Sequence, residues 1–232
     1  MRALILTTKT EHHDYFIKSI HSALEKFWVI YEKKVIRFSF ETNHRKIKKR
    51  HKFEQKYFKS HVKNKNYKNI FVTNINNSVT IKLIKSFKPN VIIVFGTSIL
   101  RKKIITACKD IPLINLHGGD PEKYRGLDSH FWCLYHKDFN SLVTTLHYIN
   151  EGIDTGNIIQ KIKVNNKPKI SFNNLRIKNV ENCVNLILKF LSRTKRGDFI
   201  KGKKQKNKGR YYSAFPSIFI DKAYNNLKKI ND

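Results

Sequence analysis

Short apolar runs alternate along this chain with longer segments in which apolar residues recur at helical spacing. The most apolar run, Val91–Phe95, is typical of a central strand that is covered on both faces of a sheet. Other runs of strand length lie at 3–6, 28–31, 70–72, 112–116, 142–149 and 158–164. Strands that alternate with helices indicate βαβ units. We therefore predict an α/β fold with a mostly parallel, twisted sheet.

Helical periodicity puts apolar residues on one face of several intervening segments. The clearest face comprises Ile177, Val180, Val184, Ile187, Leu188 and Leu191. A second face comprises Phe16, Ile17, Ile20, Leu24 and Phe27. Ser78 and the pair Asp128-Ser129 are expected N-caps of two further helices, the first of which ends before Pro89.

Two basic segments interrupt this pattern. Residues 41–68, with a run of Lys and Arg at 45–52, show weak periodicity and are expected to be solvated. Residues 193–210 hold nine Lys or Arg and one Asp, and are predicted to form an exposed loop or hairpin. We therefore expect a main domain at 1–192 and a basic C-terminal extension at 193–232, which forms a hairpin or a dimer contact.

The charge balance leaves two interpretations open. Lys and Arg number 47 against 17 Asp and Glu, a formal net charge of +30. Such an excess favours a polyanion partner, for example nucleic acid, a phosphate-bearing ligand or an anionic membrane. It also follows from the abundance of Lys, Asn and Ile that an AT-rich coding sequence produces. An apolar content of 40% excludes wholesale disorder.

Several classes of protein are disfavoured. The three cysteines are far apart and form no Cys-x-x-Cys motif, which argues against a disulfide framework and a thiolate zinc site. The motif His12-His13-Asp14 has no third ligand at a suitable spacing, so we predict no metal. No run approaches the roughly 18 apolar residues of a membrane span. The first apolar stretch is too short for a signal peptide, so we expect a cytoplasmic protein.

Polar residues follow two predicted strands at the edge of the sheet where ligands bind in α/β folds. Asn115 lies in strand 112–116 and His117 follows it directly, so the two alternate and both side chains lie on one face. Asp154 lies between Gly152 and Gly156 after a further strand. An amide can polarise a carbonyl that is attacked by an amine, a histidine can accept the proton, and a carboxylate can orient the histidine. These residues predict transfer of a carbonyl group to an amine.

The motifs around these residues resemble those of the formyltransferases that use 10-formyltetrahydrofolate. They are Asn115-Leu116-His117, Pro121–Gly126 and Gly152–Gly156. The resemblance implies a Rossmann-like formyltransferase fold and an N-formyltransferase that uses 10-formyltetrahydrofolate as its cosubstrate and no metal. It implies that Asn115 polarises the formyl carbonyl, that His117 handles the proton and that Asp154 orients His117.

The same resemblance places the pterin of the folate against the loop after strand 91–95 and the loop before Asp154. The expected folate contacts are Phe95, Gly96, Thr97, Ile99, Leu113 and Ile153. For Ile99, Leu113 and Ile153, packing in the core is an equal alternative.

Within the family, the chain is most similar to the sugar-nucleotide N-formyltransferases, through the stretches Thr10–Phe16, Tyr124–Asp128 and Gly209–Ser213. It lacks the glycine-rich phosphate loop of glycinamide ribonucleotide formyltransferases. It also lacks the Ser-Leu-Leu-Pro stretch and the C-terminal barrel of methionyl-tRNA formyltransferases. The resemblance implies a nucleotide-linked aminodeoxysugar as acceptor, such as a dTDP- or GDP-4-amino-4,6-dideoxyhexose for surface polysaccharide biosynthesis, and a homodimer.

For this acceptor, Lys9, Lys123 or Arg125 is expected to meet the diphosphate, and a plain surface arginine is the alternative for Arg125. Tyr124 or Trp132 is expected to stack on the base, although core packing is favoured for Trp132. Two other functions are kept open: a methionyl-tRNA formyltransferase-like enzyme that acts on RNA, and a degenerate relative that binds nucleic acid. Of these partners, nucleic acid is less favoured than a nucleotide sugar.

Overall fold

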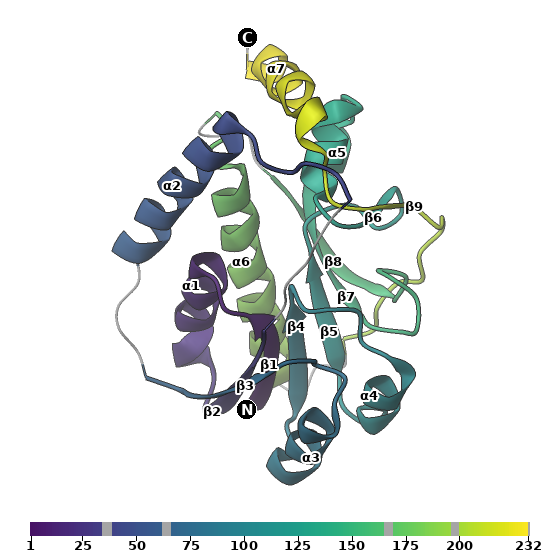
Figure 1. Cartoon of the computed structure of the whole chain (residues 1–232). Coiled ribbons are helices and arrows are strands. Elements are labelled where there is room, and N and C mark those ends of the chain that lie inside the picture. Colours follow the sequence, from purple (N-terminus) through teal and green to yellow (C-terminus); the bar gives the residue numbers. More distant parts are fainter. Residues whose placement is uncertain (34–38, 62–65, 165–168, 196–199, 232) are drawn as a thin grey trace.

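The computed structural model describes residues 1–33, 39–61, 66–164, 169–195 and 200–231. Within them, seven strands form one sheet in the order β3-β2-β1-β4-β5-β7-β8 (Figure 1). Their bounds are β1 (Arg2–Thr8), β2 (Lys26–Glu32), β3 (Lys68–Val72), β4 (Val91–Phe95), β5 (Leu113–His117), β7 (Val143–Tyr148) and β8 (Ile158–Lys163). The pairs from β3 to β5 are parallel and the two pairs that involve β7 are antiparallel. The predicted α/β fold with a mostly parallel sheet is confirmed.

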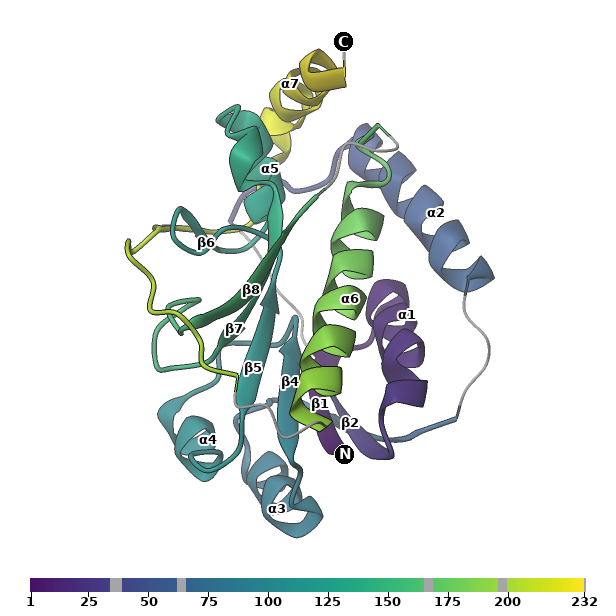
Figure 2. The same cartoon turned by 180° about the vertical axis from the view of Figure 1, so that it is seen from behind.

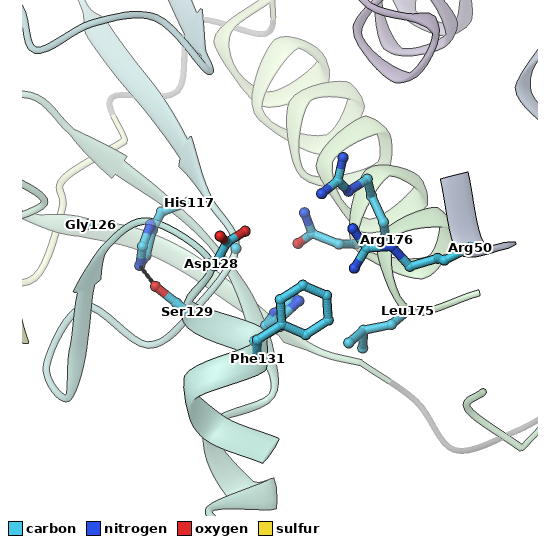
Figure 3. A pocket seen from close by; sticks show the side chains of 11 residues that line it. Arg50, His117, Gly126, Asp128, Ser129, Phe131, Leu175 and Arg176 are labelled. Atoms are coloured by element: carbon cyan, nitrogen blue, oxygen red, sulfur yellow. Dashed lines mark hydrogen bonds between the residues drawn. The ribbon is translucent and has the colours of Figure 1, made fainter. Parts of the chain in front are cut away.

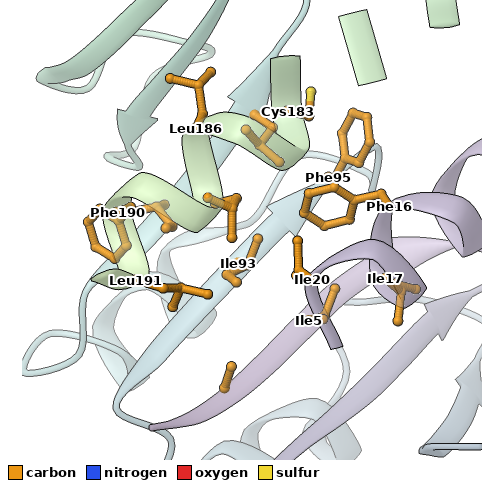
Figure 4. Close-up of a cluster of buried hydrophobic side chains, with 14 of the residues drawn as sticks. Ile5, Phe16, Ile17, Ile20, Ile93, Phe95, Cys183, Leu186, Phe190 and Leu191 are labelled. Atoms are coloured by element: carbon orange, nitrogen blue, oxygen red, sulfur yellow. The ribbon is translucent and has the colours of Figure 1, made fainter. Parts of the chain in front are cut away.

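Helices cover both faces of this sheet (Figures 1 and 2). Helices α1 (Glu11–Ile20) and α6 (Leu175–Lys195) bury apolar side chains against one face, and these meet Ile5 of β1 and Ile93 of β4 (Figure 4). Helices α3 (Ser78–Phe87) and α4 (Lys102–Ala107) cover the other face through a second apolar cluster. The central strand β4 is buried along its whole length. Burial on both faces explains its unbroken apolar run.

Two details of the predicted helices are wrong. The N-cap of α3 is Asn77, whose side chain accepts a hydrogen bond from the backbone N–H of Thr80, and Ser78 is the first helical residue. Helix α1 ends at Ile20, and Phe27 belongs to β2. Both errors are shifts near an end of an element, where neighbouring polar or apolar residues offer competing patterns.

The basic segment predicted to be solvated contains helix α2 (Arg45–Ser60). Its buried residues are Arg50, Glu54 and Phe58, which lie four residues apart and so share one face. Arg50 and Glu54 form an ion pair across 3.1 Å. Since two of the three buried positions carry charges, the apolar pattern that reveals a helix was missing. Residues 62–65 of the predicted segment lie outside the described residues.

The C-terminal residues pack onto the rest of the chain. Helix α6 continues through the expected boundary at 192/193, and residues 196–199 lie outside the described part. Strand β9 (Arg210–Tyr212) pairs in parallel with β6 (Tyr124–Gly126), and helix α7 (Ile220–Asn231) packs against α5 (Ser129–Tyr135). In the described ranges, three short 3-10 helices lie at His21–Ala23, Phe139–Ser141 and Ser217–Phe219. Residues 200–209 form no hairpin, and Lys203 makes one bridge to Ile158 of β8.

No helix within the described ranges has the length and apolar character needed to cross a membrane.

His13 provides a test of the packing of α1. Its ring is 4% exposed and lies against the ring of Phe95. Burial lowers the pKa of His13 to about 3, against a partial upward effect of the Thr8 carbonyl. The folded state therefore binds no proton here between about pH 4 and 6.5, whereas the unfolded chain does, so acidification favours unfolding.

We expect the His13→Asn variant to lose less unfolding free energy than the parent protein when the pH falls from 6 to 5. The difference should be about 1 kcal/mol, because one proton per pH unit corresponds to ~1.4 kcal/mol. Urea titrations at several pH values measure it. His61→Asn, at an exposed histidine, is the control and should leave the pH dependence unchanged. Equal pH slopes for His13→Asn and the parent would contradict the burial of a neutral His13.

Candidate active site

Three polar side chains converge at the carboxyl end of β5. Asn115 and His117 occupy alternate positions of this strand, so they point to the same face of the sheet. Asp154 lies in the loop between β7 and β8. Its carboxylate is 3.3 Å from Asn115 Nδ2 and 3.5 Å from His117 Nδ1. The structure therefore brings together the three residues that the sequence singled out.

Asp154 is the common partner of the site. It is held in the left-handed backbone region with φ of 52°, and its Oδ2 accepts a 2.8 Å hydrogen bond from the Gly126 amide. Burial by itself raises the pKa of Asp154, but the rings of His117 and His147 and the Gly126 amide together hold it well below its ordinary value. Asp154 is therefore ionised at neutral pH, although its side chain is only 11% exposed.

His117 is fixed through both ring nitrogens. Nε2 lies 2.8 Å from the Tyr124 carbonyl oxygen, which only accepts hydrogen bonds, so Nε2 carries a hydrogen. The tautomer is thus determined by the Tyr124 carbonyl, and Nδ1 faces Asp154. A proton taken up at Nδ1 forms an ion pair with the Asp154 carboxylate. The ring is suited to accept a proton and to keep it close to a stabilising charge.

His147 is a fourth member that the sequence did not single out. It lies opposite Asn115 in the antiparallel pair of β5 and β7. Its Nδ1 donates to the Tyr148 carbonyl oxygen at 2.7 Å, and its Nε2 lies 3.1 Å from Asn115 Nδ2. His147 also lies 3.4 Å from Asp154. The sequence shows His147 only as a polar residue within the predicted strand 142–149. Its position beside Asn115 depends on strand register, which the sequence pattern does not give.

A cavity of about 480 Å³ opens on one side of His117. Asn115, His117, His147 and Asp154 form its polar end. Apolar side chains supply much of the remaining wall: Val94, Ile99, Leu100, Leu127, Ile149, Ile153 and Tyr211. Four of the six expected folate contacts line this cavity, namely Gly96, Thr97, Ile99 and Ile153. We name it the large cavity.

The other two expected folate contacts are core residues. Phe95 is 7% exposed and packs against Phe16 of α1, on the opposite side of β4 from the expected ligand. Leu113 is 6% exposed and starts β5, at the end of the strand remote from His117. Neighbouring Gly96 has φ of +76°, and a Cβ there would lie 2.6 Å from His13 Nε2. Only glycine fits this turn, which leaves the backbone at the cavity wall.

A second cavity, of about 160 Å³, also borders His117 (Figure 3). We name it the arginine cavity. His117, Asp128 and Ser129 lie at one side of it and Arg50 and Arg176 at the other. Its lining also includes Gly118, Gly126, His130, Phe131, Leu175 and Asn179. His117 and Gly126 line both cavities, so both spaces border the predicted catalytic histidine.

Of the residues expected to contact a nucleotide base, neither presents a free ring. Tyr124 is 6% exposed and stacks on Tyr212, so its ring is part of the core beneath β6 and β9. The expectation that Tyr124 stacks on a base is therefore wrong in this structure, and its contribution to the site is its backbone carbonyl. Trp132 is half-buried, packs against Phe215, and donates a hydrogen bond to the Ser213 carbonyl.

The residues expected at a diphosphate lie in three different places. Lys9 is exposed, forms an ion pair with Asp14 at 2.6 Å and lies outside the linings of both cavities. Lys123 pairs with Asp138 at 3.1 Å. Arg125 is 9% exposed, and its guanidinium donates to the carbonyls of Gly209 and Ile153. Arg125 thereby connects the C-terminal segment to the Asp154 loop.

A wide groove of about 750 Å³ adjoins the large cavity along Gly152, Ile153 and Tyr211. Arg125 and the alternate residues Lys204, Lys206 and Lys208 line it. Gln205 holds this segment in place by donating to the carbonyls of Asp154 and Gly156. Part of the basic segment 193–210, which was predicted to form an exposed loop or hairpin, therefore lines a groove next to the site.

Comparison with known proteins identifies related sequences. Residues 19–188 match the family model described as formyl transferase. The methionyl-tRNA formyltransferase of Clostridioides difficile (strain 630) is 37% identical over 82 residues, which are 35% of this chain and 26% of that relative. The alignment thus spans about a quarter of the relative's length.

Solved structures share the fold over most of the chain. A sugar N-formyltransferase from Shewanella sp FDAARGOS_354 has a TM-score of 0.62 at 14% identity, covering 98% of this chain and 87% of its own. The formyltransferase PseJ from Anoxybacillus kamchatkensis, solved with UDP-4,6-dideoxy-4-formamido-L-AltNAc and tetrahydrofolate, has a TM-score of 0.53 at 18% identity, covering 92% and 86%. At these identities the likeness is one of fold, whereas the family model matches almost three quarters of the residues. The chain therefore belongs to the formyl transferase family.

Proposed function

We propose that this protein transfers the formyl group of 10-formyltetrahydrofolate to the amine of a nucleotide-linked aminodeoxysugar. The observation that carries the proposal is the convergence of Asn115, His117 and Asp154 at the large cavity, with His117 also lining the arginine cavity. A two-substrate transfer needs such an arrangement, because donor and acceptor must both come within reach of the catalytic histidine.

The large cavity suits the folate. Its apolar wall matches the faces of a flat heterocycle, and its polar end matches a ring edge that carries hydrogen-bonding groups. Two residues that line this cavity, Ile99 and Tyr211, are 58% and 51% exposed, so they present a large apolar or aromatic surface to it. A bound heterocycle would cover both. We infer that Gly96, Thr97, Ile99 and Ile153 contact the folate.

The chemistry follows from the geometry of the polar end. The acceptor amine attacks the formyl carbon, a nitrogen–carbon bond forms, and the bond from this carbon to N10 of the folate breaks. Asn115 donates a hydrogen bond to the formyl oxygen and so stabilises the negative charge that develops there. To do so, its amide gives up the 3.3 Å hydrogen bond to Asp154. His117 accepts the amine proton and then returns it to N10, the leaving nitrogen of the folate. Asp154 stabilises the protonated imidazole.

The sugar-nucleotide acceptor is supported by the sugar N-formyltransferases among the structural neighbours and by the UDP-linked formamido sugar bound to PseJ. The sequence stretches that resemble this group point the same way. With this acceptor, we also propose a role in surface polysaccharide biosynthesis in the cytoplasm and a homodimer as the working form.

The test is formyl transfer by the purified protein. We expect tetrahydrofolate to be released when 10-formyltetrahydrofolate is supplied with dTDP-, GDP- or UDP-linked aminodeoxysugars, and a formamido sugar to be detected by mass spectrometry. The matched control acceptor is the corresponding hydroxy sugar nucleotide, which lacks the amine. Absence of folate-dependent product with every amine acceptor would reject the proposal.

A second function is favoured by the match to methionyl-tRNA formyltransferase and by the exposed basic residues of α2. In this alternative the acceptor is an aminoacyl-tRNA. Binding through many phosphates weakens steeply as salt is added, whereas a small nucleotide sugar shows a shallow dependence. Formylation of methionyl-tRNA with a steep salt dependence would favour the alternative over the sugar nucleotide. Salt-sensitive RNA binding without turnover would favour a nucleic-acid-binding relative.

A further inference from the structure

Arg50 is a buried cation on a helix whose other basic residues are mostly exposed. Its side chain is 6% exposed, and its guanidinium lies 4.6 Å from the ring centre of Phe131. It lies 3.1 Å from Glu54, but its Nε makes no hydrogen bond to any described residue. Burying a charged group with incomplete hydrogen bonding costs folding free energy. Packing alone does not explain why an arginine occupies this buried position.

Arg176 brings a second guanidinium to the same wall of the arginine cavity. It comes from the start of α6, and its Nε is 3.8 Å from the same Glu54 oxygen that faces Arg50. Two guanidiniums therefore share one carboxylate. Burial and the charge of Arg176 lower the pKa of Arg50 to about 10, against the opposing effects of Glu54 and Asp128. This wall thus carries an excess of positive charge.

The opposite wall has the reverse polarity. Asp128 lies there beside His117 and Ser129, across the cavity from both arginines (Figure 3). Burial lowers the pKa of His130 to about 4, so this lining residue adds no charge at neutral pH. Asp128 disfavours an anion at the His117 end. An anionic ligand group is therefore directed to Arg50 and Arg176, away from the predicted catalytic histidine.

We propose that Arg50 and Arg176 bind an oxyanion of the amine acceptor, a phosphate or a carboxylate group, and thereby place the amine at His117. Guanidinium groups are suited to this because they offer several donors in one plane to paired oxygens. The proposal rests on the proposed function, since it takes the arginine cavity as the acceptor side. It assigns the anion to α2 and α6 instead of Arg125, whose guanidinium donates to two backbone carbonyls.

The experiment measures binding of inorganic pyrophosphate and of succinate by calorimetry, which separates a phosphate from a carboxylate source. We expect the parent protein to bind one of them and Arg176→Gln to bind it about tenfold or more weakly, as loss of a charge-assisted hydrogen bond implies. Arg50→Gln should behave alike. If its buried site prevents folding, the half-exposed Arg176 still decides the question.

Two controls make the result specific. Arg45→Gln removes an exposed arginine from the same helix and should leave anion affinity unchanged. The double variant Lys204→Gln/Lys208→Gln tests the wide groove and should also retain affinity. Equal anion affinity of Arg176→Gln and the parent, no anion binding by the parent, or loss only in the lysine variant would overturn the assignment.

Binding of tetrahydrofolate is measured on the same samples. We expect every variant to retain it, because the substituted residues lie outside the large cavity. Failure of the parent protein to bind tetrahydrofolate rejects the proposed function. If Arg176→Gln retains folate binding and turnover and has an unchanged acceptor KM, only the anion site is rejected. Failure of the anion site can therefore be distinguished from failure of the proposed function.

Discussion

Replacing His117 with asparagine is expected to lower kcat for formyl transfer by about 10²–10⁴-fold, the usual contribution of a positioned acid or base. The ring is held by the Tyr124 carbonyl on one side and faces Asp154 on the other. Asparagine cannot take up a proton from the amine at neutral pH. The expected signature is a fall in kcat with folate affinity nearly intact, measured by steady-state assay and by tetrahydrofolate titration.

The control for this substitution is His61→Asn. His61 is exposed at the end of α2 and lies outside both cavities. It should retain parental kcat, which separates loss of the catalytic imidazole from a general effect of removing a histidine. A His117→Asn enzyme with near-parental kcat would remove the base from the mechanism.

Replacing Asp154 with asparagine is expected to lower kcat by about 10²–10³-fold, because the charge that stabilises the protonated His117 is lost. The substitution keeps an oxygen to accept from the Gly126 amide, so the loop should remain in place. In the parent protein the pKa of Asp154 lies below its ordinary value of 3.8, so the carboxylate stays ionised even at a pH near 3.8. Asp154 therefore contributes no loss of activity between pH 5 and 8.

Asp110→Asn is the matched control, since Asp110 is exposed and lies in the turn after α4. We expect it to keep parental kcat and pH profile. The measurement is the pH dependence of kcat for the parent and both variants. A parental kcat for Asp154→Asn would show that the carboxylate does not assist His117. If kcat of the parent changes with a midpoint between pH 5 and 8, and Asp154→Asn removes that midpoint, then Asp154 is not ionised throughout this range.

The sequence singled out Asn115, His117 and Asp154, and a local rule accounts for the first two, since residues that alternate on a strand share a face. The rule that parallel strands end at a common edge does not account for Asp154, because β7 runs antiparallel to β5, and the loop between β7 and β8 brings Asp154 to the site. The same rules located the main strands and α6. They failed for α2, where Arg50 and Glu54 occupy buried positions that are normally apolar. No local pattern distinguishes a buried ion pair from a solvated one.

Residues with an apolar or aromatic side chain near the site were harder to assign from sequence. Phe95 and Leu113 lie in the core, whereas Ile99 and Ile153 line the large cavity. All four lie at a strand end or in the loop that follows one, and only the tertiary packing decides which of these side chains are covered. Tyr124 is similar, because its ring is buried by Tyr212, more than eighty residues later in the chain.

The order of apolar runs, the glycine-flanked Asp154 and the Asn115–His117 spacing were sufficient for the fold class, the family and the predicted catalytic residues, since each depends on neighbours in the chain. The contact of His147 with Asn115, the pairing of β9 with β6, and the two guanidiniums at Glu54 were decided by tertiary structure. These depend on strand register and on which helix faces meet. Both are set by the burial of surfaces that lie far apart in the sequence.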